Sequence, residues 1–181
     1  MPRPSVLRRK VEDIDLDRAT TLEALVREME AGGGFTAKKL AVGVDILREM
    51  FRRPGCVTFL SFPAALMATG VRGVLRHLVE RKLVDVIITT CGTADHDLAR
   101  VWQPYYHGEF EMDDVALHRL GVNRLGNVLV PNESYGIVLE KRVQPMLQEL
   151  YDAGKRNLST KELFWELGRR TESRDSLLWW A

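Results

Sequence analysis

The segment Val84-Asp-Val-Ile-Ile-Thr-Thr-Cys-Gly-Thr-Ala-Asp-His-Asp-Leu-Ala-Arg100 decides the fold class. Its first part, Val84–Ile88, is a mostly β-branched apolar run, which is typical of a strand buried on both faces of a parallel sheet. The run ends in two threonines, and Cys91–Thr93 then turns the chain into an amphipathic segment headed by Asp95–Asp97. Small residues and a titratable cluster directly after a central strand predict a ligand site at that end of the strand.

A second apolar run lies upstream and completes the pattern. Residues Cys56–Phe62 predict a first buried strand, and a helix from about Met67 to Arg81 joins it to the second. Strand, helix and strand in this order form a βαβ unit, whose two strands run parallel. Both strands end in small residues, at Ser61–Ala65 and at Thr89–Thr93. Their carboxyl ends meet at one edge of the sheet, which is therefore the predicted ligand crevice.

Apolar spacing and caps predict the remaining elements. These are helices over residues 22–31, 37–51, 113–120, 134–153 and 159–167, and an extended segment over residues 123–131. A triple glycine at residues 32–34 predicts a flexible joint, and Pro145 is expected to kink or split its helix. We therefore expect two regions: residues 1–35, an N-terminal arm and helix, and residues 36–181, an α/β region.

Composition excludes several classes of protein. The chain of 181 residues has 26 basic and 25 acidic side chains, a net charge of +1, which argues against a nucleic-acid partner. Residues 1–10 lack the apolar core of a secretion signal, and no apolar run reaches the roughly 18 residues of a membrane span. Cys56 and Cys91 have no metal-binding spacing, so we expect no metal site and a reduced, cytoplasmic protein.

Five motifs occur in a characteristic order along the chain. They are Leu60-Ser-Phe-Pro-Ala-Ala-Leu-Met-Ala-Thr-Gly70, Leu83-Val-Asp-Val-Ile-Ile-Thr-Thr90, Asp95-His-Asp-Leu98, His107-Gly-Glu-Phe110 and Asn123-Arg-Leu-Gly-Asn-Val-Leu-Val-Pro-Asn132. Together they resemble deoxyhypusine synthase, most closely its archaeal-type members, over nearly the whole chain. The resemblance implies a Rossmann-like parallel sheet flanked by helices and incomplete without a C-terminal half. It also implies that residues 36–181 form a partial NAD-binding domain.

The activity of the family supplies the expected chemistry. Its members are transferases that oxidise spermidine with NAD and transfer its aminobutyl group to a lysine of translation initiation factor 5A, the first step of hypusine biosynthesis. They are tetramers with active sites at subunit interfaces. The resemblance therefore implies NAD as cofactor, spermidine and the translation factor as substrates, and a homotetramer as the assembly.

The resemblance implies roles for residues at both strand ends. The implied NAD-contacting residues are Ala64, Ala65, Leu66, Met67, Ala68, Thr69, Thr90, Cys91, Gly92 and His96. Asp95 and His96 are implied to bind the substrate, since Asp95 keeps a carboxylate for an amine. His96 replaces an acid of the eukaryotic motif, which leaves hydrogen bonding, base chemistry and packing open for it. Asp97 is expected to be structural.

One part of the family's machinery lies outside this sequence. The catalytic lysine belongs to a later glycine-rich segment, so no catalytic residue is assigned here, and the chain is expected to be inactive without the C-terminal half. The apolar end Leu177–Trp180 is expected to need that partner as cover. Two alternatives stay open: a catalytically inactive NAD-binding or scaffolding subunit that supports an active partner, and a related polyamine-transferring enzyme.

Overall fold

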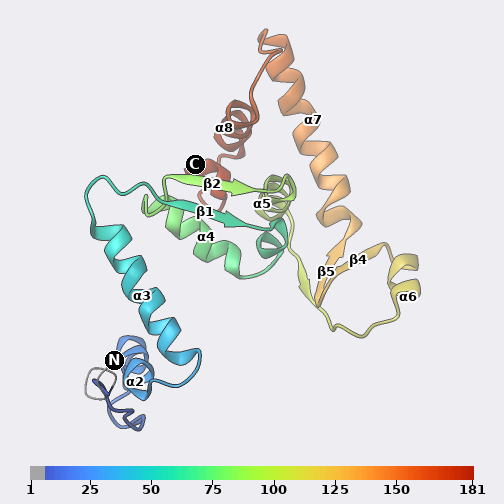
Figure 1. Cartoon of the computed structure of the whole chain (residues 1–181). Helices are drawn as coiled ribbons and strands as arrows, with labels where there is room; N and C mark the ends of the chain where they lie inside the picture. Colours follow the sequence, from blue (N-terminus) through green and yellow to red (C-terminus); the bar gives the residue numbers. More distant parts are fainter. Residues whose placement is uncertain (1–6) are drawn as a thin grey trace. The chain divides into compact units, whose positions relative to one another are not determined.

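A computed structural model describes residues 7–181, which form two compact units that divide between Cys56 and Val57. The first unit pairs two helices, α2 (Leu22–Gly32) and α3 (Ala37–Arg52) (Figure 1). The hydroxyl of Thr21 accepts a bond of 3.0 Å from the amide of Ala24 and so caps α2. Gly33, with φ of 68°, ends it in the left-handed conformation that glycine favours. The helix α3, which we expected in the α/β region, thus lies in the first unit.

The second unit carries the strands and the site. Its elements in chain order are β1 (Phe59–Phe62), η1 (Ala64–Ala68), α4 (Val71–Glu80), β2 (Val86–Thr89), α5 (Gly92–Trp102), β3 (Tyr106–His107), α6 (Asp114–Arg119), β4 (Val122–Leu125), β5 (Val128–Pro131), η2 (Asn132–Ser134), α7 (Gly136–Asp152), α8 (Thr160–Thr171) and α9 (Leu177–Trp180). Among residues 7–181, no helix combines the length and the apolar composition needed to cross a bilayer.

The predicted parallel pair is confirmed. Strands β1 and β2 pair in parallel, with Phe59 opposite Val86 and Phe62 opposite Thr89. The side chain of Phe62 is 7% exposed and packs into a core cluster with residues of η1, α4 and α9. One face of the pair is therefore buried by the helix that connects the strands and by the last helix of the chain, which gives the α/β architecture (Figure 1).

A second sheet was not predicted. The segment expected to be one extended element is a hairpin, in which β4 and β5 pair antiparallel around Gly126. The φ of 62° at Gly126 is the conformation that such tight turns require. Strand β3 joins the other edge of β5, so the order is β3-β5-β4. Its two residues are too few to carry an alternating pattern, which is why the sequence did not reveal it.

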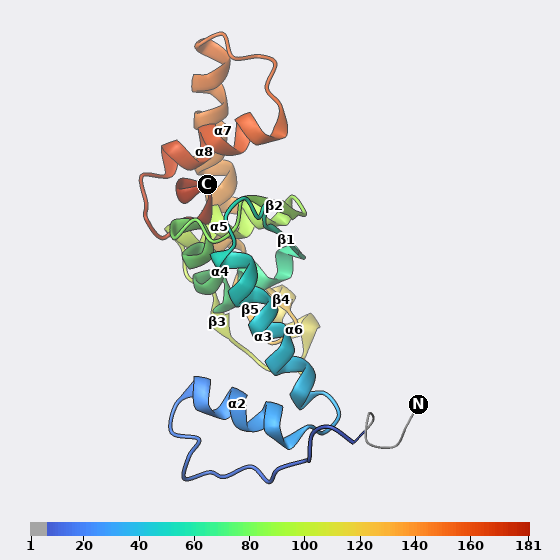
Figure 2. The same ribbon diagram turned by 60° about the vertical axis from the view of Figure 1, so that its left-hand side comes forward.

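Helix α7 follows this second sheet and runs as one element from Gly136 to Asp152, with Pro145 inside it. The expected split at Pro145 is therefore wrong. Pro145 lies on the exposed side of the helix, where water can take the carbonyl bond that its missing N–H leaves open. The chain turns back at the end of α7 and continues into α8 (Figure 2). Ser159 and Glu162 form the predicted capping box at its start.

The C-terminal turn is part of the core rather than an exposed end. Leu177 is 3% exposed and joins the cluster beneath the parallel strands, while Leu178 is 6% exposed and packs with residues of α5 and α8. Trp179 and Trp180 are half-buried. The expectation that this stretch needs a partner as cover is wrong for both leucines, because the chain's own helices already bury them.

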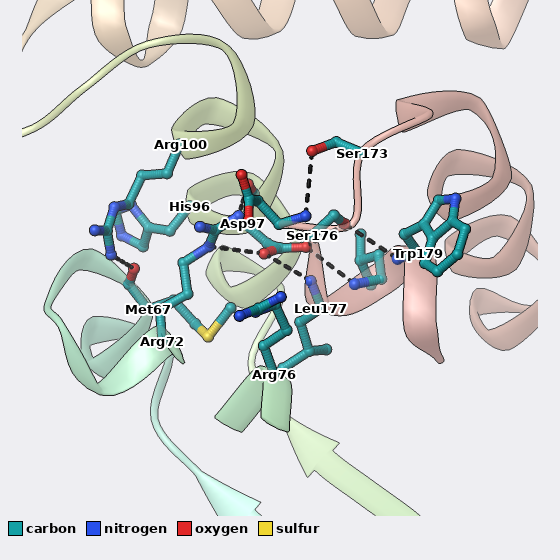
Figure 3. Close-up of polar contacts among 12 residues, drawn as sticks. Met67, Arg72, Arg76, His96, Asp97, Arg100, Ser173, Ser176, Leu177 and Trp179 are labelled. Carbon is teal, nitrogen blue, oxygen red and sulfur yellow. Dashed lines mark hydrogen bonds and ion pairs between the residues drawn. The ribbon is translucent and has the colours of Figure 1, made fainter. Parts of the chain in front are cut away.

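A buried carboxylate holds the turn in place. The side chain of Asp97, on α5, is 0% exposed. It accepts bonds from the Ser176 hydroxyl at 2.7 Å and from the amides of Leu177 and Leu178 at 3.0 Å each (Figure 3). The guanidinium of Arg72, on α4, donates to the same carboxylate at 2.9 Å. Burying a carboxylate is unfavourable unless such donors replace its water, and here four of them do.

We predict that Asp97→Asn lowers the free energy of unfolding by about 3 kcal/mol, because the amide cannot accept all four bonds and leaves Arg72 buried without its counter-charge. Urea unfolding of the purified protein measures this change. Asp175→Asn is the matched control, since that exposed carboxylate lies on the same turn. Equal stability of the two variants would contradict the structural role of Asp97.

Candidate cofactor and amine site

Threonine side chains connect the two strand exits, which are the segments that directly follow β1 and β2. The hydroxyl of Thr89, at the end of β2, donates to the carbonyl of Phe62 at 2.7 Å. The hydroxyl of Thr90 accepts from the amide of Ala64 at 3.2 Å. Both exits therefore begin side by side at one edge of the parallel pair.

Small residues let the exits approach each other. A Cβ atom placed on Gly92 would lie 3.0 Å from the Cβ of Ala64, which is closer than side-chain atoms normally come. Gly92 was expected to contact NAD. In the structure, the space where its side chain would lie is limited by the Cβ of Ala64. Cys91, at the exposed start of α5, is the neighbouring residue that faces solvent.

The first exit is a short 3-10 helix whose side chains are mostly structural. Met67 and Ala68 are 0% and 3% exposed, so their side chains lie in the core, and Leu66 packs against the same cluster. The hydroxyl of Thr69 donates to the carbonyl of Leu66 at 2.8 Å. Of the residues expected to contact NAD here, Ala65 is exposed, and three others, Ala64, Leu66 and Thr69, are half-buried.

The second exit presents a carboxylate and an imidazole between two tyrosines. Asp95 and His96 lie in the first turns of α5, and the hydroxyl of Tyr135 donates to Oδ2 of Asp95 at 3.2 Å. Nδ1 of His96 and the hydroxyl of Tyr105 share a hydrogen bond of 2.9 Å. The rings of His96 and Tyr135 have centroids 5.1 Å apart. We call these four residues, Asp95, His96, Tyr105 and Tyr135, the crevice cluster.

Burial sets the protonation states in the crevice cluster. It lowers the pKa of His96 below its ordinary value, an effect that Asp95 opposes and Arg100 adds to. It raises the pKa of Tyr105, and with the charge of Asp95 it raises that of Tyr135 to about 12. Near neutral pH, both phenols therefore keep their protons and the imidazole is neutral. The cluster can hold a cation at the carboxylate and can accept a proton at the imidazole.

Sequence reasoning found part of this site. It selected Asp95 and His96, which the structure places together, but it did not select Tyr105 or Tyr135. Tyr135 lies 40 residues after Asp95, in the segment 134–153 that was expected to be a helix. Within residues 7–181, no group of three or more histidine, cysteine or acidic side chains is arranged to hold a metal ion.

This chain is similar to proteins of one family over most of its length. The family model for deoxyhypusine synthase matches residues 24–181. The chain therefore belongs to the deoxyhypusine synthase family. A "Probable deoxyhypusine synthase" of Picrophilus torridus is 49% identical over 179 residues, and one of Thermoplasma acidophilum is 45% identical over the same length.

The shared length is incomplete. Each of these two alignments covers 99% of this chain and 57% of the relative. The fold is also that of the crystal structure of a "putative deoxyhypusine synthase" from Entamoeba histolytica, with a TM-score of 0.60 at 21% identity, over 94% of this chain and 60% of the other. The chain thus spans somewhat more than half of the proteins it resembles.

We predict a pH-dependent contribution of His96 to stability. Folding lowers the pKa of His96, so between its pKa in the folded protein and about 6.5 the unfolded chain binds more protons than the folded one. The free energy of unfolding therefore rises with pH in that window. The free energy of unfolding of the unmodified protein, minus that of His96→Asn, should therefore be larger at about pH 7.5 than at about pH 5.5. Urea unfolding at both values measures the difference. His107→Asn, at an exposed histidine, is the control substitution.

Proposed function

We propose that this chain is the N-terminal portion of an NAD-dependent deoxyhypusine synthase, which transfers the aminobutyl group of spermidine to a lysine of translation initiation factor 5A. Family membership supports the reaction class. The observation that carries the proposal is the crevice cluster, in which the carboxylate of Asp95 lies beside the aromatic rings of His96 and Tyr135 at the shared end of two parallel strands. A carboxylate next to aromatic faces suits an ammonium group, which both attract.

NAD fits the exits better through their backbone than through their side chains. At the edge of a parallel sheet, small residues such as Ala64 and Ala65 allow a dinucleotide to approach the main chain closely. Gly92 lets the second exit lie against Ala64. Thr90 and Cys91 are exposed at the second exit and complete the surface. When bound, NAD supplies the acceptor for a hydride. The chain's own task is to orient the amine at Asp95 and to receive a proton at His96.

The nucleophilic lysine is expected from another polypeptide segment. Lys155 is engaged by Glu166 at 2.7 Å, and Lys161 lies 4.4 Å from the ring centroid of Trp165. Lys141 lies on an exposed face of α7. None of these three lysines belongs to the crevice cluster. We therefore propose that the C-terminal half of the enzyme completes the site and that such pairs assemble as a homotetramer in the cytoplasm.

We predict that the purified 181-residue chain alone does not cleave spermidine in the presence of NAD, and that adding the C-terminal half restores cleavage. The reason is that a transferase of this class needs an activated lysine, which the crevice cluster lacks. Release of the diamine product measures the activity. Turnover by the chain alone would contradict the proposal, whereas a completed assembly that binds NAD without turnover would favour the scaffolding alternative.

We also predict that Asp95→Asn weakens spermidine binding about 10-fold or more, because a charge-assisted hydrogen bond is lost. The affinity for NAD and the free energy of unfolding should stay close to those of the unmodified protein. Calorimetry on the assembled enzyme measures both ligands. Glu133→Gln, at an exposed carboxylate near Tyr135 in the chain, is the matched control. Unchanged spermidine affinity in Asp95→Asn would remove Asp95 from the site.

A further inference from the structure

The side chain of Arg100 connects the two strand exits. It lies on α5, one turn after His96, and its Nη1 donates to the carbonyls of Met67 and Thr69 at 2.8 and 2.6 Å. The carbonyl of Met67 stands at the end of η1, where a short helix leaves its last acceptors without helical partners. The carbonyl of Thr69, just after η1, also accepts from the amide of Arg72 at 3.3 Å. Figure 3 shows Arg100 reaching from α5 to Met67. One guanidinium group therefore closes the end of the first exit.

The same guanidinium also faces the second exit. Its central carbon lies 5.7 Å from the ring centroid of Tyr105, within the range of a cation–π contact. Tyr105 in turn is hydrogen-bonded to His96. A displacement of Arg100 would therefore reach both the segment expected to contact NAD and the imidazole expected to receive a proton.

We propose that Arg100 is a positioning residue of the strand-edge site, which holds η1 in place for the cofactor and Tyr105 in place for His96. This inference rests on the proposed function for what the site binds, but the contacts of Arg100 with η1 and Tyr105 do not depend on it. Nη1 makes both bonds to η1, while the rest of the planar guanidinium lies near the Tyr105 ring. A lysine side chain is one bond shorter and carries its charge on a single nitrogen, so its ammonium cannot reach both carbonyls and also keep the contact with the ring.

Three measurements test the proposal in the assembled enzyme. The first is amide hydrogen exchange over residues 64–69. Arg100→Met should speed exchange there about 10-fold or more, because two charge-assisted bonds are lost. Arg76→Met is the matched control: Arg76, on α4, also donates to a carbonyl, that of Arg174 at 2.9 Å, but away from η1. Equal exchange over residues 64–69 in the two variants would overturn the proposal.

The second measurement is the titration of His96 by NMR with labelled histidine. The groups that face it are Asp95 and Arg100 on α5 and the phenols of Tyr105 and Tyr135, with Arg72 next to Arg100. Arg100→Met removes a positive charge and should raise the pKa of His96, whereas Arg100→Lys keeps the charge and should leave it near the original value. A rise in the pKa of His96 in the lysine variant, or the lack of a rise in the methionine variant, would contradict the proposed placement of Arg100.

The third measurement is NAD affinity by calorimetry. Arg100→Lys should lower it about 10-fold while leaving the titration of His96 unchanged, because the charge stays and the bridge to η1 is lost. Arg76→Met should leave the affinity unchanged. An Arg100→Lys protein that binds NAD normally would overturn the positioning role. If the unmodified protein binds no NAD while the exchange and titration results are as expected, Arg100 keeps its role and the proposed cofactor is wrong.

Discussion

The buried carboxylate of Asp97 is the interaction on which the second unit depends. Without its four donors the charge would be too costly to bury, and without the charge the amides of the C-terminal turn would lack acceptors. The contact puts Leu177 and Leu178 into two separate core clusters. Gly168, on α8, permits it, because any side chain there would collide with the carbonyl of Leu178.

The same carboxylate orients the site. Successive residues of a helix point about 100° apart, so anchoring Asp97 toward the core leaves Asp95 and His96 on other sides of α5. There they meet Tyr135 and Tyr105, which hold them by hydrogen bonds. The buried carboxylate and the residues of the proposed site thus occupy neighbouring positions, and the buried one determines where the others point.

The chain belongs to the deoxyhypusine synthase family and spans part of the length of its relatives. The chain contains the strand exits and the crevice cluster, and it covers 57% of the length of the two archaeal relatives. The parallel pair has two strands, and parallel sheets are generally covered on both faces. Phe59 and Ile88, on the face away from α4, are 63% and 58% exposed, so this face of the pair is less covered than the other.

The sequence alone was enough for features that depend on neighbouring residues. The β-branched run before Thr89 determined a strand, and Ser159 with Glu162 determined a helix start, because strand propensity and capping act within a few residues. The tertiary structure decided the contacts between distant residues. Tyr135 reaches Asp95 across 40 residues, and the amide of Leu177 reaches Asp97 across 80. No local pattern encodes such pairs, because they form only once packing of the helices and strands has brought their backbones together.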